Sequence, residues 1–209
     1  MRIAIVGTGR IGANAARLFA KAGHEVVLSF SRDQDKLEAL AAELGGRAAS
    51  PREAVQAAEV VFFSVPWRIV DDVLEQTGSL AGRIVIDTTN QYGHSGWEDL
   101  GGRTAAQVNA ARMPGARYTK AFNTLTSGFQ AEAAGRTGRD RVVMFLCGDD
   151  EEAKRVVAGL IDDAGFTPVD MGGTADAAPM EAPRRPGAVY GEEVHETEAR
   201  EFVERMRAT

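Results

Sequence analysis

The sequence predicts an α/β protein built on a doubly wound parallel sheet, and two observations indicate this fold class. Short apolar runs alternate with amphipathic helical patterns over most of the chain, which is typical of parallel strands joined by right-handed crossover helices. The run EVVFFSV at residues 59–65 is almost continuously apolar, as expected for a strand that is covered on both faces. We therefore expect helices on both sides of one central sheet.

The first 32 residues contain a glycine-rich turn between a predicted strand and a predicted helix. Residues 3–6 are apolar, glycines follow at Gly7, Gly9 and Gly12, and a second apolar run covers residues 26–28. Gly7 permits a tight turn, Gly9 lets the backbone approach a pyrophosphate, and Gly12 lets the helix pack closely on the strand. The N-terminus of this helix offers N–H groups and a partial positive charge to phosphates. This context predicts a Rossmann-like dinucleotide site.

The end of the second strand indicates which dinucleotide is bound. An NAD site usually has Asp or Glu here for the ribose 2′-hydroxyl, whereas an NADP site uses Arg and small polar groups around the 2′-phosphate. This chain has Ser29, Ser31 and Arg32 at the end of the strand, and no acid follows until Asp33. Ser31 and the planar fork of Arg32 suit phosphate oxygens, and Arg10 in the glycine turn adds charge. Alternatively, Ser31 caps the helix that begins near Asp33 and Arg32 is solvated. Both roles are compatible, so we favour NADP over NAD.

The remaining elements follow in order from similar patterns. Gly45 and Gly46 end the second helix, Ser50 and Pro51 begin the third as N-cap and first helical residue, and Pro66 ends the long apolar strand. The expected helices cover residues 33–44, 51–57, 69–76, 105–112 and 149–164. The expected strands cover residues 47–49, 59–65, 83–87, 117–120, 141–147 and 166–170.

Three segments follow the carboxyl ends of central strands, where doubly wound sheets bind their ligands. They are residues 64–67, 88–91 and 121–124, and we expect them to converge near the nicotinamide end of the cofactor. Trp67 is interpreted either as a wall of the pocket or as ordinary packing at a strand end. Asn90 and Asn123, the latter preceded by Phe122, either hold the nicotinamide carboxamide or ribose, or close their own turns.

Composition excludes several classes of function. The chain has 209 residues and a net charge of −6, which argues against a nucleic-acid or anionic-membrane partner. The apolar runs are too short to cross a membrane, and the first one is a strand rather than a signal peptide. Cys147 is the single cysteine, so we expect no internal disulfide and a cytoplasmic location. The three histidines are far apart in sequence, so we expect no metal site.

The composition changes near residue 173, so we divide the chain into residues 1–172, the nucleotide-binding domain, and residues 173–209, a C-terminal arm that forms no independent domain. Prolines concentrate in residues 175–191, and Met180, Val189 and Tyr190 are isolated apolar anchors there. Residues 193–207 are expected to form a charged helix. The anchors favour packing of the arm on its own domain or on a partner subunit, and a homodimer is expected from base rates.

Several runs of this chain together resemble one family. They are MRIAIVGTGRIGANAARLFAKAGHEV, SFSRD, SVPW, TTN, KAFNTL and CGDDEEAKRVV, and the resemblance is to the coenzyme F420-dependent NADP reductases. This family also includes the NADPH-binding domain of membrane ferric reductases. The resemblance extends from residue 1 to about residue 172. It implies NADP(H) as the cofactor and a deazaflavin, coenzyme F420, as the co-substrate.

The resemblance also implies roles for individual residues. Ser31 and Arg32 match the family's 2′-phosphate site. The phosphate loop is matched by Thr8, Arg10 and Ile11, and the turn over the cofactor is matched by Val65, Pro66 and Trp67. The implied reaction is hydride transfer between nicotinamide C4 and C5 of the deazaflavin, which depends mainly on proximity and orientation. Arg184 and Arg185 of the arm are candidates to receive the acidic tail of the deazaflavin.

Two alternatives stay open. In the first, the chain is an NADPH-dependent reductase of another small acceptor: an imine, an enone, a flavin or a ferric complex. If the reduction of such a substrate also requires a proton, a side chain has to donate it, and His94 and Tyr190 are the candidate catalytic residues. In the second, the chain is a non-catalytic NADP sensor whose arm reports cofactor occupancy to a partner protein.

Overall fold

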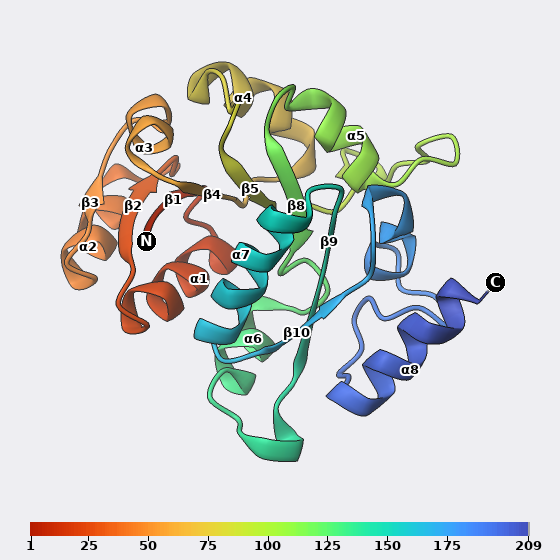
Figure 1. The fold of residues 1–209 in the computed structure, drawn as a ribbon. Helices are drawn as coiled ribbons and strands as arrows, with labels where there is room; N and C mark the ends of the chain where they lie inside the picture. Colours follow the sequence, from red (N-terminus) through yellow and green to blue (C-terminus); the bar gives the residue numbers. More distant parts are fainter. Residues whose placement is uncertain (209) are drawn as a thin grey trace.

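The computed structural model describes residues 1–208 and shows an eight-stranded sheet between two layers of helices (Figure 1). The strands lie in the order β10-β9-β8-β5-β4-β1-β2-β3. Their bounds are β1 Arg2–Val6, β2 Glu25–Ser29, β3 Arg47–Ala48, β4 Val60–Phe63, β5 Ile84–Asp87, β8 Arg117–Ala121, β9 Val143–Gly148 and β10 Thr167–Asp170. The predicted α/β fold class is confirmed.

The sheet is parallel from β3 to β8 and changes direction at one place. There β8 pairs antiparallel with β9, with Thr119 opposite Gly148, and β10 runs parallel to β9. The expectation of a parallel sheet is therefore corrected at this edge. The apolar run in β9 does not reveal its direction, because a strand buried on both faces has the same pattern either way.

Helices cover both faces of the sheet, as a doubly wound fold requires. α1, α2, α6 and α7 pack on one face, and α3, α4, α5 and α8 pack on the other. Their bounds are α1 Arg10–Lys21, α2 Gln34–Glu43, α3 Pro51–Ala57, α4 Val70–Thr77, α5 Ala105–Arg112, α6 Ser127–Ala133, α7 Glu151–Asp163 and α8 Glu196–Arg207. None of the helices among residues 1–208 is both long and apolar enough to cross a lipid bilayer.

Alternation along β1 shows how the sequence builds two cores around one sheet. Ile3 and Ile5 lie in the cluster that contains α1, whereas Ala4 and Val6 lie in the cluster that contains α3. Successive side chains of a strand point to opposite faces, so residues 3–6 of β1 face one core or the other, and all four are apolar and buried. The carboxyl ends of the six strands from β8 to β3, which run parallel, form one edge of the sheet.

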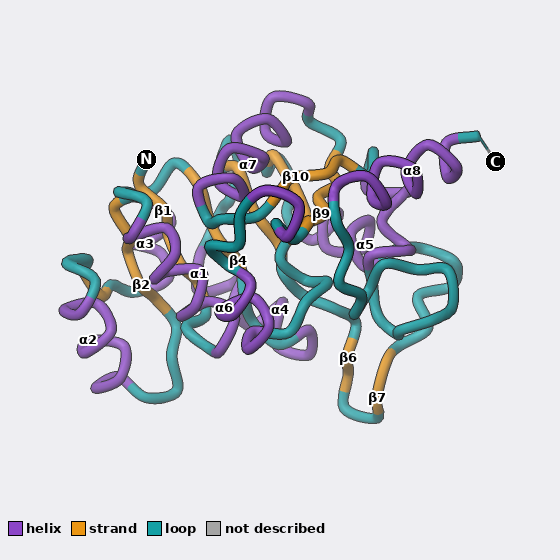
Figure 2. The backbone as a smooth tube through the Cα atoms, turned by 90° about the horizontal axis from the view of Figure 1, so that it is seen from below, coloured by secondary structure: helices purple, strands orange, loops and turns teal. Residues whose placement is uncertain are grey.

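Two elements were not anticipated from the sequence. The short helix α6 follows β8, and a two-stranded hairpin follows β5, with β6 at Tyr92–Gly93 and β7 at Gly96–Trp97. Figure 2 shows this hairpin projecting from the body of the molecule. A 3₁₀ turn at Trp67–Ile69 also precedes α4.

The arm lies against the rest of the chain. A 3₁₀ segment, Thr174–Met180, follows β10 and leads through a loop to α8. Met180 and Val189 are buried in the same cluster as the α3 face of the sheet. The backbone of Gly191 donates to the carbonyl of Thr124 at 2.8 Å. The arm therefore reaches the loop that follows β8.

Candidate dinucleotide site

The glycine turn joins the carboxyl ends of three neighbouring strands. The N–H of Gly7 donates to the carbonyl of Ser29 at 2.9 Å, and the N–H of Thr8 donates to the carbonyl of Phe30 at 3.2 Å. Gly7 has φ +99°, and a Cβ there would overlap the carbonyl of Ser64 after β4. A Cβ on Gly12 would overlap the carbonyl of Gly7. Both glycines are therefore required by close backbone approach.

Gly9 differs from these two glycines. Its φ is −67°, which any residue adopts, and a Cβ there would meet no atom of the described residues within 4 Å. Neither conformation nor packing requires glycine at this position. Gly9 is the N-cap of α1, and its first turn has no acidic side chain. A phosphate approaching these N–H groups accounts for a glycine here, so the residues fit the expected pyrophosphate.

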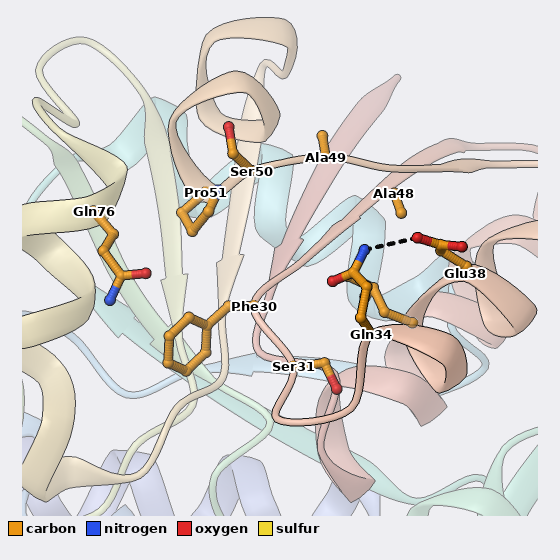
Figure 3. A pocket seen from close by; sticks show the side chains of 10 residues that line it. Phe30, Ser31, Gln34, Glu38, Ala48, Ala49, Ser50, Pro51 and Gln76 are labelled. Carbon is orange, nitrogen blue, oxygen red and sulfur yellow. Dashed lines mark hydrogen bonds between the residues drawn. The ribbon is translucent and has the colours of Figure 1, made fainter.

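Ser31 lies between two surface hollows at the end of β2. The first has a volume of about 500 Å³ and extends from Phe30 and Ser31 to Pro51 on α3 and Gln76 on α4 (Figure 3). The second has a volume of about 370 Å³ and is lined by Thr8, Ser31 and Lys36, among others. The predicted 2′-phosphate residue is thus accessible from both sides.

The N-cap of α2, the helix after β2, is Asp33 and not Ser31, which was the alternative considered from the sequence. Asp33 is the N-cap of α2 and accepts from the N–H of Lys36 at 3.2 Å. Ser31 instead accepts from the N–H of Asp33 at 3.1 Å. The hydroxyl hydrogen of Ser31 is left to donate, and Arg32 is exposed beside it. Lys36 was not singled out from the sequence, but it lines the second hollow, and its Nζ lies 2.9 Å from Asp33 Oδ2.

The turn after β4 contributes one accessible residue and two buried ones. Val65 is buried, Pro66 is exposed, and Trp67 is 5% exposed. The indole of Trp67 donates to Glu98 Oε2 at 2.8 Å, and the guanidinium of Arg112 stacks on its ring at 4.7 Å. Of the two interpretations given for Trp67, these contacts fit ordinary packing at the strand end.

Asn90 and Asn123, which follow β5 and β8, lie side by side. Asn90 Nδ2 donates to the carbonyl of Asn123 at 3.0 Å, and Asn123 Nδ2 lies 3.2 Å from Asn90 Oδ1. Three buried amide oxygens, on Gln91, Asn123 and Gln130, accept no hydrogen bond from the described residues, and the first two follow β5 and β8 at this edge. The two predicted asparagines are thus brought together at the carboxyl edge, while their contact with a cofactor stays a prediction.

Backbone strain directly precedes two of the predicted contact residues. Phe30 has φ +61° and Phe122 has φ +59°, a region that costs a non-glycine residue roughly 1–2 kcal/mol and that is concentrated at functional sites. They precede Ser31 and Asn123, respectively. The ring of Phe122 is fully buried against Phe62, 5.3 Å between ring centres. Our expectation of Phe122 as a cofactor contact is corrected for its ring, which belongs to the core.

A buried group of charges lies beneath the same edge, and sequence analysis did not anticipate it. Lys120 on β8 is fully buried, and its Nζ lies 2.5 Å from the carbonyl of Thr89, 3.5 Å from Asp87 Oδ2 and 3.8 Å from Glu181 Oε1. Asp87 accepts from the hydroxyl of Tyr118 at 2.6 Å. Burial and the neighbouring carboxylate raise the pKa of Tyr118 well above its usual range. Charged residues inside the strand runs RIVID and RYTKA were the available signal.

The candidate proton donors lie in different surroundings. His94 is exposed in the turn of the hairpin. Tyr190 is half-buried in the arm, and burial together with a hydrogen bond to Tyr92 raises its pKa above the usual range. The two arginines of the arm that were candidates for the deazaflavin tail already have partners: Arg184 contacts Glu192 at 2.7 Å, and Arg185 donates to the carbonyl of Ala178. Because its pKa is raised, Tyr190 keeps its proton at neutral pH, and both His94 and Tyr190 stay candidate proton donors.

Comparison with known proteins adds independent findings. A family model for coenzyme F420-dependent NADP oxidoreductases matches residues 2–91. Metalloreductase STEAP3 of Rattus norvegicus is 31% identical over 181 residues, which are 87% of this chain and 36% of the metalloreductase. The chain thus spans about a third of the length of that relative.

Solved structures agree with these matches. A hypothetical protein from Sinorhizobium meliloti is 32% identical, with a TM-score of 0.82 and coverage of 94% of this chain and 96% of that one. A protein from Arthrobacter sp. FB24, named as an F420-dependent NADP-reductase, is 24% identical, with a TM-score of 0.73 and coverage of 84% and 86%. At that identity the second likeness shows the shared fold.

Proposed function

We propose that the chain is a member of the family of coenzyme F420-dependent NADP oxidoreductases, whose model matches residues 2–91, and that it transfers a hydride between NADP(H) and the deazaflavin coenzyme F420. In this proposal the 2′-phosphate binds at Ser31 and Arg32, and the pyrophosphate binds at the N-terminus of α1. The observation that carries it is the site at the end of β2, where Ser31 lies between two hollows and Arg32 is exposed beside it. An acid for the ribose 2′-hydroxyl is replaced there by groups that suit a phosphate.

The cofactor supplies the reactive hydride when it is bound, and the chain supplies position. The adenosine end is held at β2, so the dinucleotide extends along the carboxyl edge toward Pro66, Asn90 and Asn123. Hydride transfer to a planar acceptor requires the two rings to lie face to face at contact distance. Reduction of the deazaflavin takes one hydride from NADPH and one proton from solvent or from a donor. Tyr190 is the proposed donor when the acceptor requires one.

A different acceptor is the second candidate, and one observation favours it. The 31% identity to a rat metalloreductase indicates that the same nucleotide domain can serve reduction of a metal complex. Arg184 is paired with Glu192, so the arm does not offer an unpaired Arg184 to the acidic tail of a deazaflavin. A small uncharged acceptor is compatible with this pairing.

The test is a turnover assay with the purified chain and NADPH. Oxidation of NADPH is followed by the loss of nicotinamide absorbance with coenzyme F420, a free flavin, a cyclic imine or a ferric chelate as acceptor. The proposal predicts turnover with F420 that exceeds turnover with the other acceptors. Turnover only with another acceptor supports the second candidate, and tight NADPH binding without any turnover supports the sensor alternative.

A further inference from the structure

Asn123 presents one unpaired oxygen beneath the carboxyl edge. The side chain is 5% exposed, and its Nδ2 donates to the carbonyl of Met180 at 2.6 Å. Its Oδ1 accepts no hydrogen bond from the described residues. A buried acceptor without a donor is destabilising, and such groups in folded proteins call for an explanation. The unpaired oxygen therefore points to a ligand that supplies an N–H or O–H.

The arm determines which atom of this amide is unpaired. If the amide were turned over, Oδ1 would face the carbonyl of Met180 at 2.6 Å, and two acceptors would repel each other. Asn90 Oδ1 accepts from the N–H of Ala182 at 3.3 Å, which fixes the neighbouring amide in the same way. Contact with the arm thus fixes the orientation of the Asn123 amide. The unpaired atom is the acceptor Oδ1, and the amide cannot rotate to put Nδ2 in its place.

Glu181 holds this part of the arm in place. Its two carboxylate oxygens accept from the N–H groups of Ala105 and Ala106 at the start of α5, each at 2.8 Å. Glu181 is 2% exposed, and Oε1 lies 3.8 Å from Lys120 Nζ. Removal of one partner of a buried charged group leaves the other charge uncompensated, which is strongly destabilising. Met180 and Ala182, on either side of Glu181, are therefore positioned by it.

We propose that Glu181 is a positioning residue for the nicotinamide subsite. Through the carbonyl of Met180 it fixes the amide of Asn123, so that Oδ1 accepts a hydrogen bond from the NH₂ group of the nicotinamide carboxamide. The ligand class is a primary carboxamide, and an analogue without that donor is rejected because the oxygen stays unpaired. The inference rests on the proposed function, because it places the nicotinamide ring at this edge. The arm then forms part of the cofactor site, although it is distant in sequence.

The experiment compares three probes by titration calorimetry. They are NADP⁺, its 3-acetylpyridine analogue, in which a methyl group replaces the carboxamide NH₂, and 2′,5′-ADP, which lacks the nicotinamide half. The variants are Glu181→Gln and Asn123→Ala, with Glu192→Gln as a matched control from the same arm. Thermal unfolding shows that each variant is folded at the titration temperature. The wild-type chain should bind NADP⁺ about tenfold more tightly than the acetyl analogue, the effect of one buried hydrogen bond.

Glu181→Gln and Asn123→Ala are expected to abolish this preference while they leave the affinity for 2′,5′-ADP within about twofold of wild type. Glu192→Gln should keep the full preference. A Glu181→Gln chain that retains the preference, or that loses affinity for all three probes equally, overturns the positioning role. If the wild-type chain binds none of the probes, the proposed function itself falls, and the positioning role falls with it.

Discussion

Arg32 and Ser31 show how far single residues can be interpreted from their positions in the sequence. Both directly follow β2, and the glycine turn is hydrogen-bonded to the end of that strand. This arrangement was predictable because the strand, the turn and the next helix are adjacent along the chain. By contrast, Trp67 and Phe122 are buried by distant residues such as Glu98 and Phe62. Their side-chain directions depend on contacts that no local pattern contains.

Replacement of Arg32 by Ala tests the phosphate assignment. The change should weaken NADPH binding by about 1.5–3 kcal/mol, the usual contribution of a hydrogen bond to a charged group. NADH has no 2′-phosphate, so its affinity should be nearly unchanged. Fluorescence titration of both coenzymes measures this difference. Arg200→Ala on α8, which removes another exposed arginine, is the control, and an equal loss for both coenzymes would refute the role of Arg32.

The buried charges mark the limit of residue-level prediction. Asp87 and Lys120 are visible in the sequence as charged residues in strand runs. Lys120 lies between Asp87 and Glu181, however, and so joins positions from β5, β8 and the arm. Sequence analysis placed the arm only by its apolar anchors. The role proposed for Glu181 therefore required the structure.

At the scale of elements, the caps of the helices explain why most boundaries were predictable. Ser50 and Glu53 form a capping box at the start of α3, and Asp150 caps α7 by accepting from the N–H groups of Glu152 and Ala153. Such residues are visible in the sequence. Helix α6 is as short as α3, but its first turn holds Ser127 and Gly128 instead of a proline and a capping-box glutamate. Each strand of the hairpin has only two residues, so these patterns did not stand out.

The cap of α7 also predicts a pH dependence of stability. Arg117 contacts both oxygens of Asp150, at 2.7 and 2.9 Å, and this pairing with the helix N–H groups lowers the pKa of Asp150 below its ordinary 3.8. A lowered pKa in the folded state stabilises the protein above the unfolded value, and this stabilisation disappears as the pH falls through the folded value. Asp150→Asn should therefore reduce the free energy of unfolding at neutral pH.

The difference between the wild type and Asp150→Asn should shrink as the pH falls below about 4, where the unfolded carboxyl becomes protonated. Urea unfolding at a series of pH values measures the difference. Asp140→Asn, in the exposed turn Gly138–Asp140, is the control and should show a small effect throughout. A difference that stays constant through the acid range would contradict the contribution of the Asp150 charge.

Across the whole molecule, the fold brings five segments to one edge of the sheet. They are the glycine turn, the end of β2, the loop after β5, the loop after β8, and the arm. The arm contacts the loop after β8 through Met180 and Gly191 and the loop after β5 through Ala182. The doubly wound topology predicted that the segments after β4, β5 and β8 converge at this edge. The position of the arm depends on its own tertiary contacts. A homodimer stays a prediction, for which the exposed Tyr92 and Trp97 of the hairpin offer a surface to examine.

We propose that one NADPH molecule lies along this edge, from Ser31 and Arg32 to Asn123, and a crystal structure of the chain with NADPH is the decisive test. We expect the 2′-phosphate within hydrogen-bond distance of Ser31 Oγ and the Arg32 guanidinium, the pyrophosphate at the N-terminus of α1, and the carboxamide nitrogen at Asn123 Oδ1. NADPH bound elsewhere, or a pocket at Ser31 filled by the protein's own side chains, would contradict it.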